Sequence, residues 1–376
     1  MKLIYCMASV YNPGGMERVL LNKASWFAAR EGYDVMVVTT DQQGKPPFYS
    51  FPSAVRMTDL GINYSLDNGH SPIVKIINYF RKRQKHKKAL TDLLLKEKAD
   101  IVVSLYPSES SFIPGIKDGS KKVLELHINR YFRTQYGRSG LLGLADRFRE
   151  RQDLRIARRF DKFVVLTKED AGYWENLPNL AVIPNAAPDI KETSYDPSCR
   201  RVIAVGRLDY QKGFDRLIDA WALIPEEHRE GWKLDIFGQG EWKEMLEGMI
   251  DRLGINDSVK INPPTKDIFK EYSSSAFIVM SSHFEGLPMV LLEAMSRGVP
   301  GVCFDFKCGP KDIIRNGKNG MLVPEGDILA LASAMESIMR DPTLRTHLSE
   351  EALKTCFEYT EDKVMEQWVN CFKSIQ

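Results

Sequence analysis

Short apolar runs alternate with helical stretches along the whole sequence, and this alternation restricts the fold more than any other feature. In the first half, residues 2–7 have the pattern of a buried strand, residues 18–31 that of a helix, and residues 34–40 that of a second strand. A strand, a loop, a helix and a strand in this order form the βαβ unit of a parallel, doubly wound α/β sheet. Further strands are expected at 101–104, 122–126 and 163–167.

The chain is long enough for two domains. Its 376 residues exceed the usual size of one hydrophobic core. The pattern breaks near residue 190, in a stretch rich in proline and polar residues, and a second alternation then begins. We therefore expect two Rossmann-like domains, over 1–190 and 191–357. The expected strands and helices of the second half are 201–205, 215–221, 233–237, 241–253, 259–261, 276–281, 301–306 and 327–340.

The stretch from Phe284 to Pro300 combines two carboxylates with a short, strongly specified helix. Pro288 suits a first helical turn because it lacks an N–H, and Gly298 suits the helix end. The N-terminus of such a helix favours an anion such as phosphate. Glu285 would lie beside this anion site, and Glu293 about two turns along the helix. By themselves, both glutamates are equally compatible with ordinary surface positions on a helix.

The spacing of the two glutamates, with seven residues between them in a Phe-Glu-Gly-Leu-Pro setting, resembles the signature of glycosyltransferase family 4. This resemblance implies the GT-B fold, in which two Rossmann-like domains face each other across a cleft. It implies that Glu285 is catalytic and faces the donor sugar, and that Glu293 binds the ribose hydroxyls of a sugar nucleotide. The same motif implies further donor-binding residues, namely Gly286, Leu287, Pro288 and Met289.

The resemblance also implies different roles for the two domains. The first, 1–190, would bind the acceptor, and the second, 191–357, would bind the nucleotide sugar. The last helix, expected within 358–376, would pack back onto the first domain. In such folds ligands bind at the carboxyl ends of the strands, so the site is expected in the cleft between the domains.

Two cations follow the first strand of the second half. Arg207 and Lys212 lie in the run from Val205 to Gly213, which comes after a strand and before a helix, so both are expected to face the cleft. They would hold the donor diphosphate and stabilise the charge that develops on the leaving nucleotide. A solvated basic turn is the alternative. The run closely matches the phosphate-binding motif of the same family, which implies that Arg207 and Lys212 are catalytic and bind the donor.

Glycines and a histidine complete the expected site. Gly14 and Gly15 resemble the glycine-rich loop of the family, where the backbone can approach a diphosphate or an acceptor closely. Gly238 follows another strand and is expected to bind the donor, and the absence of a third glycine at dinucleotide spacing argues against ordinary dinucleotide binding. His127 follows a strand, where the family has a catalytic histidine against the donor sugar. A purely structural histidine is the alternative.

No Asp-x-Asp motif occurs in the sequence, whereas GT-A glycosyltransferases use it to hold a divalent metal. Arg207, Lys212 and the helix N-terminus can replace that metal, so we expect no metal and no other cofactor. The stretch from Phe304 to Ile314 resembles a subset of bacterial surface-polysaccharide transferases, although Gly309 to Ile313 departs from the usual family motif.

These resemblances imply a retaining glycosyltransferase of cell-surface polysaccharide biosynthesis. It would move a hexose or N-acetylhexosamine, UDP-linked by expectation, to a glycan or polyprenyl-linked glycan acceptor. A sugar-nucleotide epimerase of the same fold and a non-catalytic subunit that binds sugar nucleotides are the alternatives.

Two basic belts in the first half dominate the charge pattern, although the net charge is only +2. The segment from Lys75 to Lys88 contains seven Lys and Arg residues and no acid, beside an apolar run, which predicts a basic amphipathic element. A second, arginine-rich belt runs from Arg130 through Arg138 to Arg159. The belts would either hold the protein on an anionic membrane or be solvated. No nucleic-acid recognition motif accompanies them, so nucleic acid is not an expected partner.

The expected location is the cytoplasm, with peripheral binding to the inner face of the plasma membrane as one alternative. No segment is long and apolar enough for a signal peptide or a membrane span. The six cysteines contain no Cys-x-x-Cys pair and no histidine at metal-ligand spacing, which is typical of reduced thiols in the cytosol.

Overall fold

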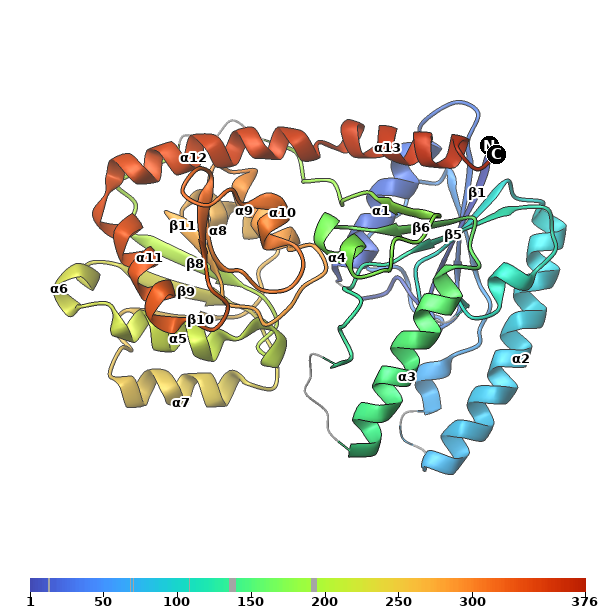
Figure 1. Cartoon of the computed structure of the whole chain (residues 1–376), viewed down its shortest axis with the longest axis horizontal. Helices are drawn as coiled ribbons and strands as arrows, with labels where there is room; N and C mark the ends of the chain where they lie inside the picture. Colours follow the sequence, from blue (N-terminus) through green and yellow to red (C-terminus); the bar gives the residue numbers. More distant parts are fainter. Residues whose placement is uncertain (13, 68, 70, 108, 135–139, 191–194) are drawn as a thin grey trace.

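The computed structural model describes residues 1–12, 14–67, 69, 71–107, 109–134, 140–190 and 195–376. Within these ranges, two parallel sheets form two lobes, and the C-terminal helices run along both of them (Figure 1). The predicted doubly wound α/β class is confirmed. Pro13 of the glycine loop, Arg138 of the second basic belt and residues 191–194, at the expected start of the second domain, lie outside the described residues.

The first lobe contains a seven-stranded parallel sheet in the order β3-β2-β1-β4-β5-β6-β7. Successive side chains point to opposite faces, so Leu3 and Tyr5 lie in one hydrophobic core while Ile4 and Cys6 lie in another. Because both faces are covered at the centre of the sheet, β1 and β4 are nearly continuous buried runs, whereas the edge strand β3 is mostly exposed. The strands are β1 (Lys2–Met7), β2 (Asp34–Thr39), β3 (Val55–Asp59), β4 (Ile101–Ser104), β5 (Lys121–Glu125), β6 (Lys162–Val165) and β7 (Leu180–Val182).

The second lobe contains a six-stranded parallel sheet in the order β10-β9-β8-β11-β12-β13. The strand order reverses between β8 and β11 here, and between β1 and β4 in the first sheet. Loops at such switch points leave a crevice at the carboxyl ends of the strands, where ligands of this fold class bind. The strands are β8 (Arg201–Val205), β9 (Lys233–Phe237), β10 (Val259–Asn262), β11 (Phe277–Met280), β12 (Gly301–Phe304) and β13 (Gly320–Val323).

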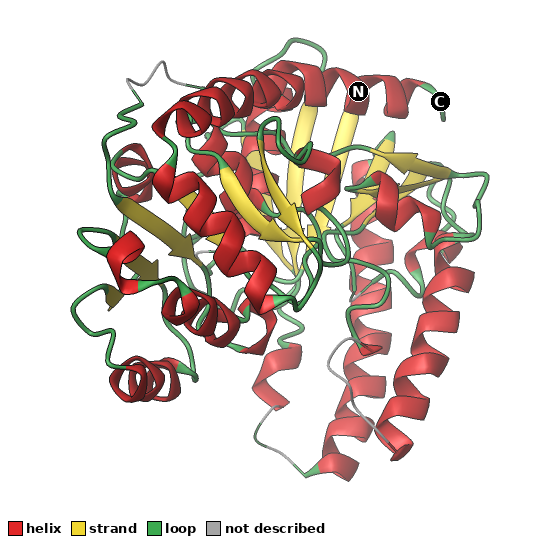
Figure 2. Cartoon of the chain, turned by 60° about the vertical axis from the view of Figure 1, so that its left-hand side comes forward, coloured by secondary structure: helices red, strands yellow, loops and turns green. Residues whose placement is uncertain are grey.

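Helices cover both faces of the sheets (Figure 2). The last helix lies on the first lobe, where Trp368 and Phe372 are buried with residues of β1 and α1. The helices are α1 (Gly15–Ala28), α2 (Pro72–Glu97), α3 (Gly140–Ala157), α4 (Lys168–Gly172), α5 (Phe214–Leu223), α6 (Glu226–Arg229), α7 (Lys243–Leu253), α8 (Ile268–Ser273), α9 (Met289–Met295), α10 (Pro310–Ile313), α11 (Ile328–Arg340), α12 (Pro342–Cys356) and α13 (Glu361–Lys373).

The first basic belt lies on α2, which has 26 residues. The N-terminal ends of α2 and α3 project from the first lobe, at the lower right of Figure 1. The apolar residues of this part of α2 are not packed against the domain, since Ile73, Ile76 and Phe80 are 72%, 58% and 60% exposed. On α3, Leu144 and Phe148 are similarly exposed. The amphipathic pattern therefore leaves apolar and basic side chains on the same exposed surface.

Candidate active site

Glu285 lies in the loop after β11, and its carboxylate is held by three side chains. Lys212 Nζ lies 2.7 Å from Oε1, and the Ser282 hydroxyl donates to the same oxygen at 2.8 Å. Gln211 Nε2 donates to Oε2 at 3.3 Å and to the carbonyl oxygen of Phe284 at 3.1 Å. The structure thus brings together two residues that the sequence singled out 73 positions apart, Glu285 and Lys212.

The loop after β8 places Lys212 by close backbone packing. The aliphatic part of Lys212 lies over Gly206, where an added Cβ would be 2.9 Å from it. A Cβ on Gly238 would lie 1.9 Å from the carbonyl oxygen of Gly206. Gly238 is therefore required for the contact between the loops that follow β8 and β9. Arg207 is more open: its side chain is 68% exposed and lies near Asp209.

Glu293 lies on α9 and is partly buried. The Tyr272 hydroxyl donates to Glu293 Oε2 at 3.1 Å. Burial raises the pKa of the Glu293 carboxyl, while the Tyr272 hydrogen bond and the cations Arg18 and Lys212 lower it to a smaller extent. Arg18 belongs to α1, so a cation of the first lobe faces this carboxylate of the second.

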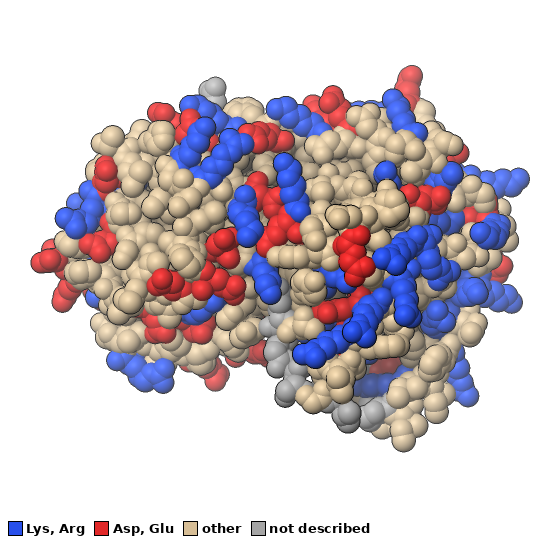
Figure 3. Space-filling model, viewed as in Figure 1, with Lys and Arg blue, Asp and Glu red and all other residues tan. Residues whose placement is uncertain are grey.

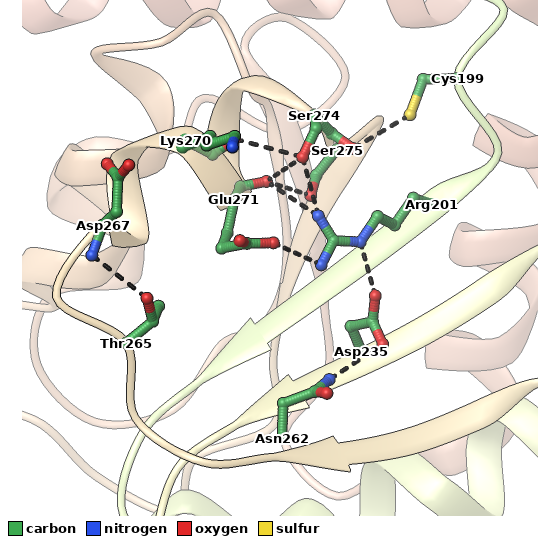
Figure 4. A network of polar contacts seen from close by, with 10 residues as sticks. All are labelled: Cys199, Arg201, Asp235, Asn262, Thr265, Asp267, Lys270, Glu271, Ser274 and Ser275. Atoms are coloured by element: carbon green, nitrogen blue, oxygen red, sulfur yellow. Dashed lines mark hydrogen bonds and ion pairs between the residues drawn. The ribbon is translucent and has the colours of Figure 1, made fainter.

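A polar network holds α8, the helix that carries Tyr272, against the second sheet (Figure 4). Arg201 of β8 donates to Asp235 at 2.5 Å and to Glu271 at 2.7 Å. Charge-assisted hydrogen bonds of this kind fix orientation as well as adding stability. Because Glu271 precedes Tyr272 in α8, the network fixes the helix from which Tyr272 reaches Glu293.

The helix of the two-glutamate stretch is shorter than predicted. It begins at Met289, so Pro288 is the residue before the helix and not part of its first turn, and α9 has only seven residues. Gly298 has a φ of +72°, which fits its predicted place at the helix end. Leu287 is buried in the core of the second lobe.

His127 follows β5 and meets the two-glutamate stretch across the junction of the lobes. A Cβ on Gly286 would lie 2.2 Å from the carbonyl oxygen of His127, so the two backbones are in direct contact. Asn129 Nδ2 donates to the carbonyl oxygen of Glu285 at 2.8 Å. The segment after β5 in the first lobe therefore sets the position of the Glu285 loop in the second.

Gly14 and Gly15 lie where α1 begins, after β1. The expected helix at 18–31 is α1 (Gly15–Ala28), which starts three residues earlier, and Gly14 is its N-cap. A Cβ on Gly14 would lie 2.1 Å from the Glu17 carboxylate, whereas Gly15 has nothing within 4 Å. Burial raises the pKa of Glu17, and His127 lowers it to a smaller extent. The glycine loop therefore lies close to His127.

A second junction between the lobes involves the atypical segment Gly309 to Ile313. Asp312 accepts the backbone N–H of Lys168 at 2.9 Å. In return, Glu169 of α4 accepts the backbone N–H of Cys308 at 3.0 Å. Each lobe thus supplies a carboxylate that binds the backbone of the other. Figure 3 shows acidic and basic side chains side by side where the lobes meet.

The structure adds residues that the sequence analysis did not assign to the site. Gln211 and Ser282 lie within or next to the motifs, and their polar side chains could have been noticed there. Tyr272 and Arg18 carry no local signal, because they approach Glu293 only through the packing of α8 and α1.

Two family models match this chain: Glycosyltransferase Family 4 over residues 13–189 and Glycosyl transferases group 1 over residues 189–355. The amylovoran biosynthesis glycosyltransferase AmsD of Erwinia amylovora is 35% identical over 218 residues, which is 55% of this chain and 61% of that protein. The match to an exopolysaccharide phosphotransferase of Streptomyces coelicolor is 34% identical and spans 57% of this chain, but only 23% of that protein.

Full-length similarity is found at lower identity. An N-acetyl-D-galactosaminyltransferase of Campylobacter jejuni is 25% identical over 100% of this chain and 99% of its own. The crystal structure of TarM has a TM-score of 0.81 with 16% identity, over 99% of this chain and 98% of that one. This likeness confirms the predicted GT-B fold. The two family models together run from residue 13 to residue 355 on that fold, and the chain therefore belongs to glycosyltransferase family 4.

Proposed function

We propose that this protein is a retaining glycosyltransferase that needs no metal ion. It moves a hexose or N-acetylhexosamine from a nucleoside diphosphate sugar to a glycan acceptor of a bacterial cell surface. The observation that carries the proposal is the convergence of Lys212, Glu285 and Glu293 at the switch point of the second sheet, next to the segment that carries His127. A sugar nucleotide needs cations for its phosphates and acceptors for its hydroxyls, and this site offers both.

The geometry favours retention without a covalent intermediate. The carboxylate of Glu285 already accepts hydrogen bonds from Lys212, Ser282 and Gln211, which lowers its reactivity as a nucleophile. In the proposed step the bond from the sugar to the leaving phosphate breaks, and the acceptor oxygen bonds to the same face of the sugar. The leaving phosphate takes the acceptor proton, while Lys212 and Arg207 stabilise its negative charge.

The relatives guide the choice of donor and acceptor. The name of the Campylobacter jejuni relative describes transfer of N-acetyl-D-galactosamine to a glycan on diphospho-undecaprenol. A TarM structure was determined in complex with UDP. We therefore propose a UDP-linked hexose or N-acetylhexosamine as donor and a polyprenyl-linked glycan as acceptor.

A donor screen followed by a transfer assay tests the function. One nucleotide sugar should raise the melting temperature selectively, because ligand binding stabilises the folded state by mass action. That donor should then transfer its sugar to a polyprenyl-linked acceptor in excess EDTA. A strict requirement for added divalent metal would contradict the metal-free proposal. Conversion of the donor to an epimer without an acceptor would instead support an epimerase.

Replacing Glu293 with alanine is expected to weaken binding of the nucleoside diphosphate. Two charge-assisted hydrogen bonds to the ribose hydroxyls are worth about 1.5 to 3 kcal/mol each, so the dissociation constant should rise about a hundredfold or more. Isothermal titration with UDP measures this change. Glu244→Ala, on the exposed surface of α7, is the control and should bind normally. Unchanged affinity in Glu293→Ala would reduce Glu293 to a structural helix residue.

We further propose that the protein docks on an anionic membrane through the projecting ends of α2 and α3, where a lipid-linked acceptor would be in reach. Basic side chains gather on the right-hand side of the first lobe in Figure 3, above the tip formed by these helix ends. Each cation near an anionic surface contributes about 1 kcal/mol, and the exposed Ile73, Ile76 and Phe80 add apolar area that can enter the headgroup region. Among the described helices, none is long and apolar enough to cross the bilayer.

Cosedimentation with anionic vesicles tests this surface. Binding is expected at low salt and should weaken at high salt, because the attraction is screened. Arg81→Glu with Lys85→Glu should abolish it, while the matched charge reversal Lys243→Glu with Arg252→Glu on α7 should not. Absence of binding at low salt, or binding that is indifferent to the α2 reversal, would rule out this docking surface.

A further inference from the structure

A buried carboxylate behind His127 has no role in the function proposed above. Glu125 is the last residue of β5 and is fully buried. His127 Nε2 lies 3.0 Å from Glu125 Oε1, and the His127 side chain is only 4% exposed. Lys23 of α1 forms an ion pair with the same oxygen. One carboxylate oxygen thus joins the histidine to a lysine of a neighbouring helix.

The ion pair is enclosed on every side. The Lys23 side chain is 5% exposed, and its Nζ lies 3.8 Å from the ring centroid of Trp368 on α13. A cation over an indole ring is stabilised by the ring quadrupole. Burial alone would raise the pKa of Glu125, but Lys23 and His127 lower it to about 2, so the group is a carboxylate. Lys23 of α1, supported by Trp368 of α13, thus keeps Glu125 negatively charged beside His127.

This cluster is more elaborate than a structural ion pair requires. A buried Lys–Glu pair is costly to desolvate, and a well-packed apolar pair is often as stable. Among the residues that the structure describes, neither Glu125 Oε2 nor His127 Nε2 has a hydrogen bond of regular geometry, so the carboxylate is not placed to satisfy both of its oxygens. The other oxygen, Oε1, faces both Lys23 and the His127 ring. A role in orienting the His127 ring explains this arrangement better than a contribution to the stability of the fold does.

We propose that Glu125 is a positioning residue, which fixes the His127 ring with its Nε2 proton toward the carboxylate and leaves Nδ1 as the ring nitrogen available to the substrate. Lys23 holds Glu125 in place for this task. A carboxylate oxygen 3.0 Å from one ring nitrogen favours the tautomer that carries its proton on that nitrogen, because a lone pair there would face a negative charge, even though the contact lacks the angle of a regular hydrogen bond. The effect of Glu125 on catalysis rests on the proposed function, but the tautomer of His127 is independent of it.

Other titratable groups face this cluster from each neighbouring element. Glu17 of α1 interacts with His127, and Tyr5 of β1 and Cys371 of α13 interact with Glu125. Burial raises the pKa of Tyr5 and, to about 11, that of Cys371. Both are neutral near pH 7, so neither adds a charge next to His127.

The first test measures the tautomer of His127 directly and needs no substrate. Nitrogen-15 spectra of ring-labelled protein, assigned by loss of one signal set in His127→Ala, should show the proton on Nε2 in the wild type. In Glu125→Gln the amide can either accept or donate, so the His127 signals should move toward a mixture of tautomers. Unchanged His127 ring shifts in Glu125→Gln would overturn the proposal, whatever reaction the protein catalyses.

The second test is kinetic. Glu125→Gln should lower kcat about 10- to 100-fold, the usual effect of losing the group that orients a histidine, with little change in the KM for the donor. Glu109→Gln is the matched control, because Glu109 is also buried but its carboxylate accepts a hydrogen bond from Ser104, and within the described part of the chain it forms no hydrogen bond or ion pair with His127. Burial raises the pKa of Glu109 to about 7, so a neutral amide changes less charge here than at an ordinary carboxylate, and kcat should stay near the wild-type value.

Two double variants keep the result interpretable. Glu125→Gln alone leaves the buried charge of Lys23 unpaired, which can prevent folding. Lys23→Met with Glu125→Gln removes both buried charges, so this double variant should fold. It should show the same loss in kcat. In the His127→Ala background, Glu125→Gln should have no further effect, since Glu125 acts through His127. A further tenfold loss in that background would show that Glu125 acts independently of His127, and the proposal would fail.

Discussion

Alanine at position 212 is expected to lower kcat by about two to three powers of ten, the usual effect of removing one group that stabilises developing charge. In the proposed reaction Lys212 holds the leaving phosphate; its side chain is only 14% exposed and lies beside Glu285. Low exposure strengthens its interaction with an anion, since solvent screens it less. The variant also leaves Glu285 without its closest cation, which adds to the loss.

Arg207→Ala is expected to cause a loss of similar size for a different structural reason. The Arg207 guanidinium is mostly exposed and lies 3.4 Å from Asp209, so it has room to turn toward a diphosphate. Single-turnover assays at saturating donor separate the loss in chemistry from any change in affinity. Lys243→Ala on α7 serves as the surface control and should transfer normally. Near-normal rates in both purified variants, Arg207→Ala and Lys212→Ala, would remove the phosphate assignment.

Local sequence pattern predicted the regular elements of this fold closely. The strands expected at 2–7, 101–104, 201–205 and 233–237 are β1, β4, β8 and β9 with the same bounds. These segments are short and mostly apolar, and the polar turns on either side of them mark the first and last residue of each strand. Helix ends were less accurate: α5 begins at Phe214, one residue before the expected start, and runs two residues past the expected end.

Tertiary contacts could not be predicted in the same way. The basic amphipathic pattern of 75–88 did not indicate whether its apolar side packs on the domain, and Ile73 and Phe80 are exposed because the helix projects from the first lobe. Tyr272 reaches Glu293 only because α8 packs against α9. The buried link from Lys23 to His127 joins residues more than 100 positions apart, and no local spacing predicts it.

Gly286→Ala is expected to reduce kcat about 100-fold, since a displacement of about 1 Å in a catalytic geometry can have an effect of this size. The added Cβ would lie 2.2 Å from the carbonyl oxygen of His127. Both atoms belong to backbone or are fixed to it, so no flexible side chain can move aside. The methyl group must push the Glu285 loop away from the segment after β5, and it must weaken the hydrogen bond from Asn129.

This loss should occur without unfolding, because each lobe has its own hydrophobic core and Gly286 lies where the lobes meet. The melting temperature should therefore change little, and UDP should still bind, since Lys212 and Glu293 both belong to the second lobe. Gly248→Ala in α7 is the matched control, because a Cβ there has nothing within 4 Å. That helix should gain about 0.5 to 1 kcal/mol from alanine. Normal turnover by Gly286→Ala would show that contact between the His127 and Glu285 segments is not needed for catalysis. Loss of UDP binding would instead support the donor-binding role that the resemblance implies for Gly286.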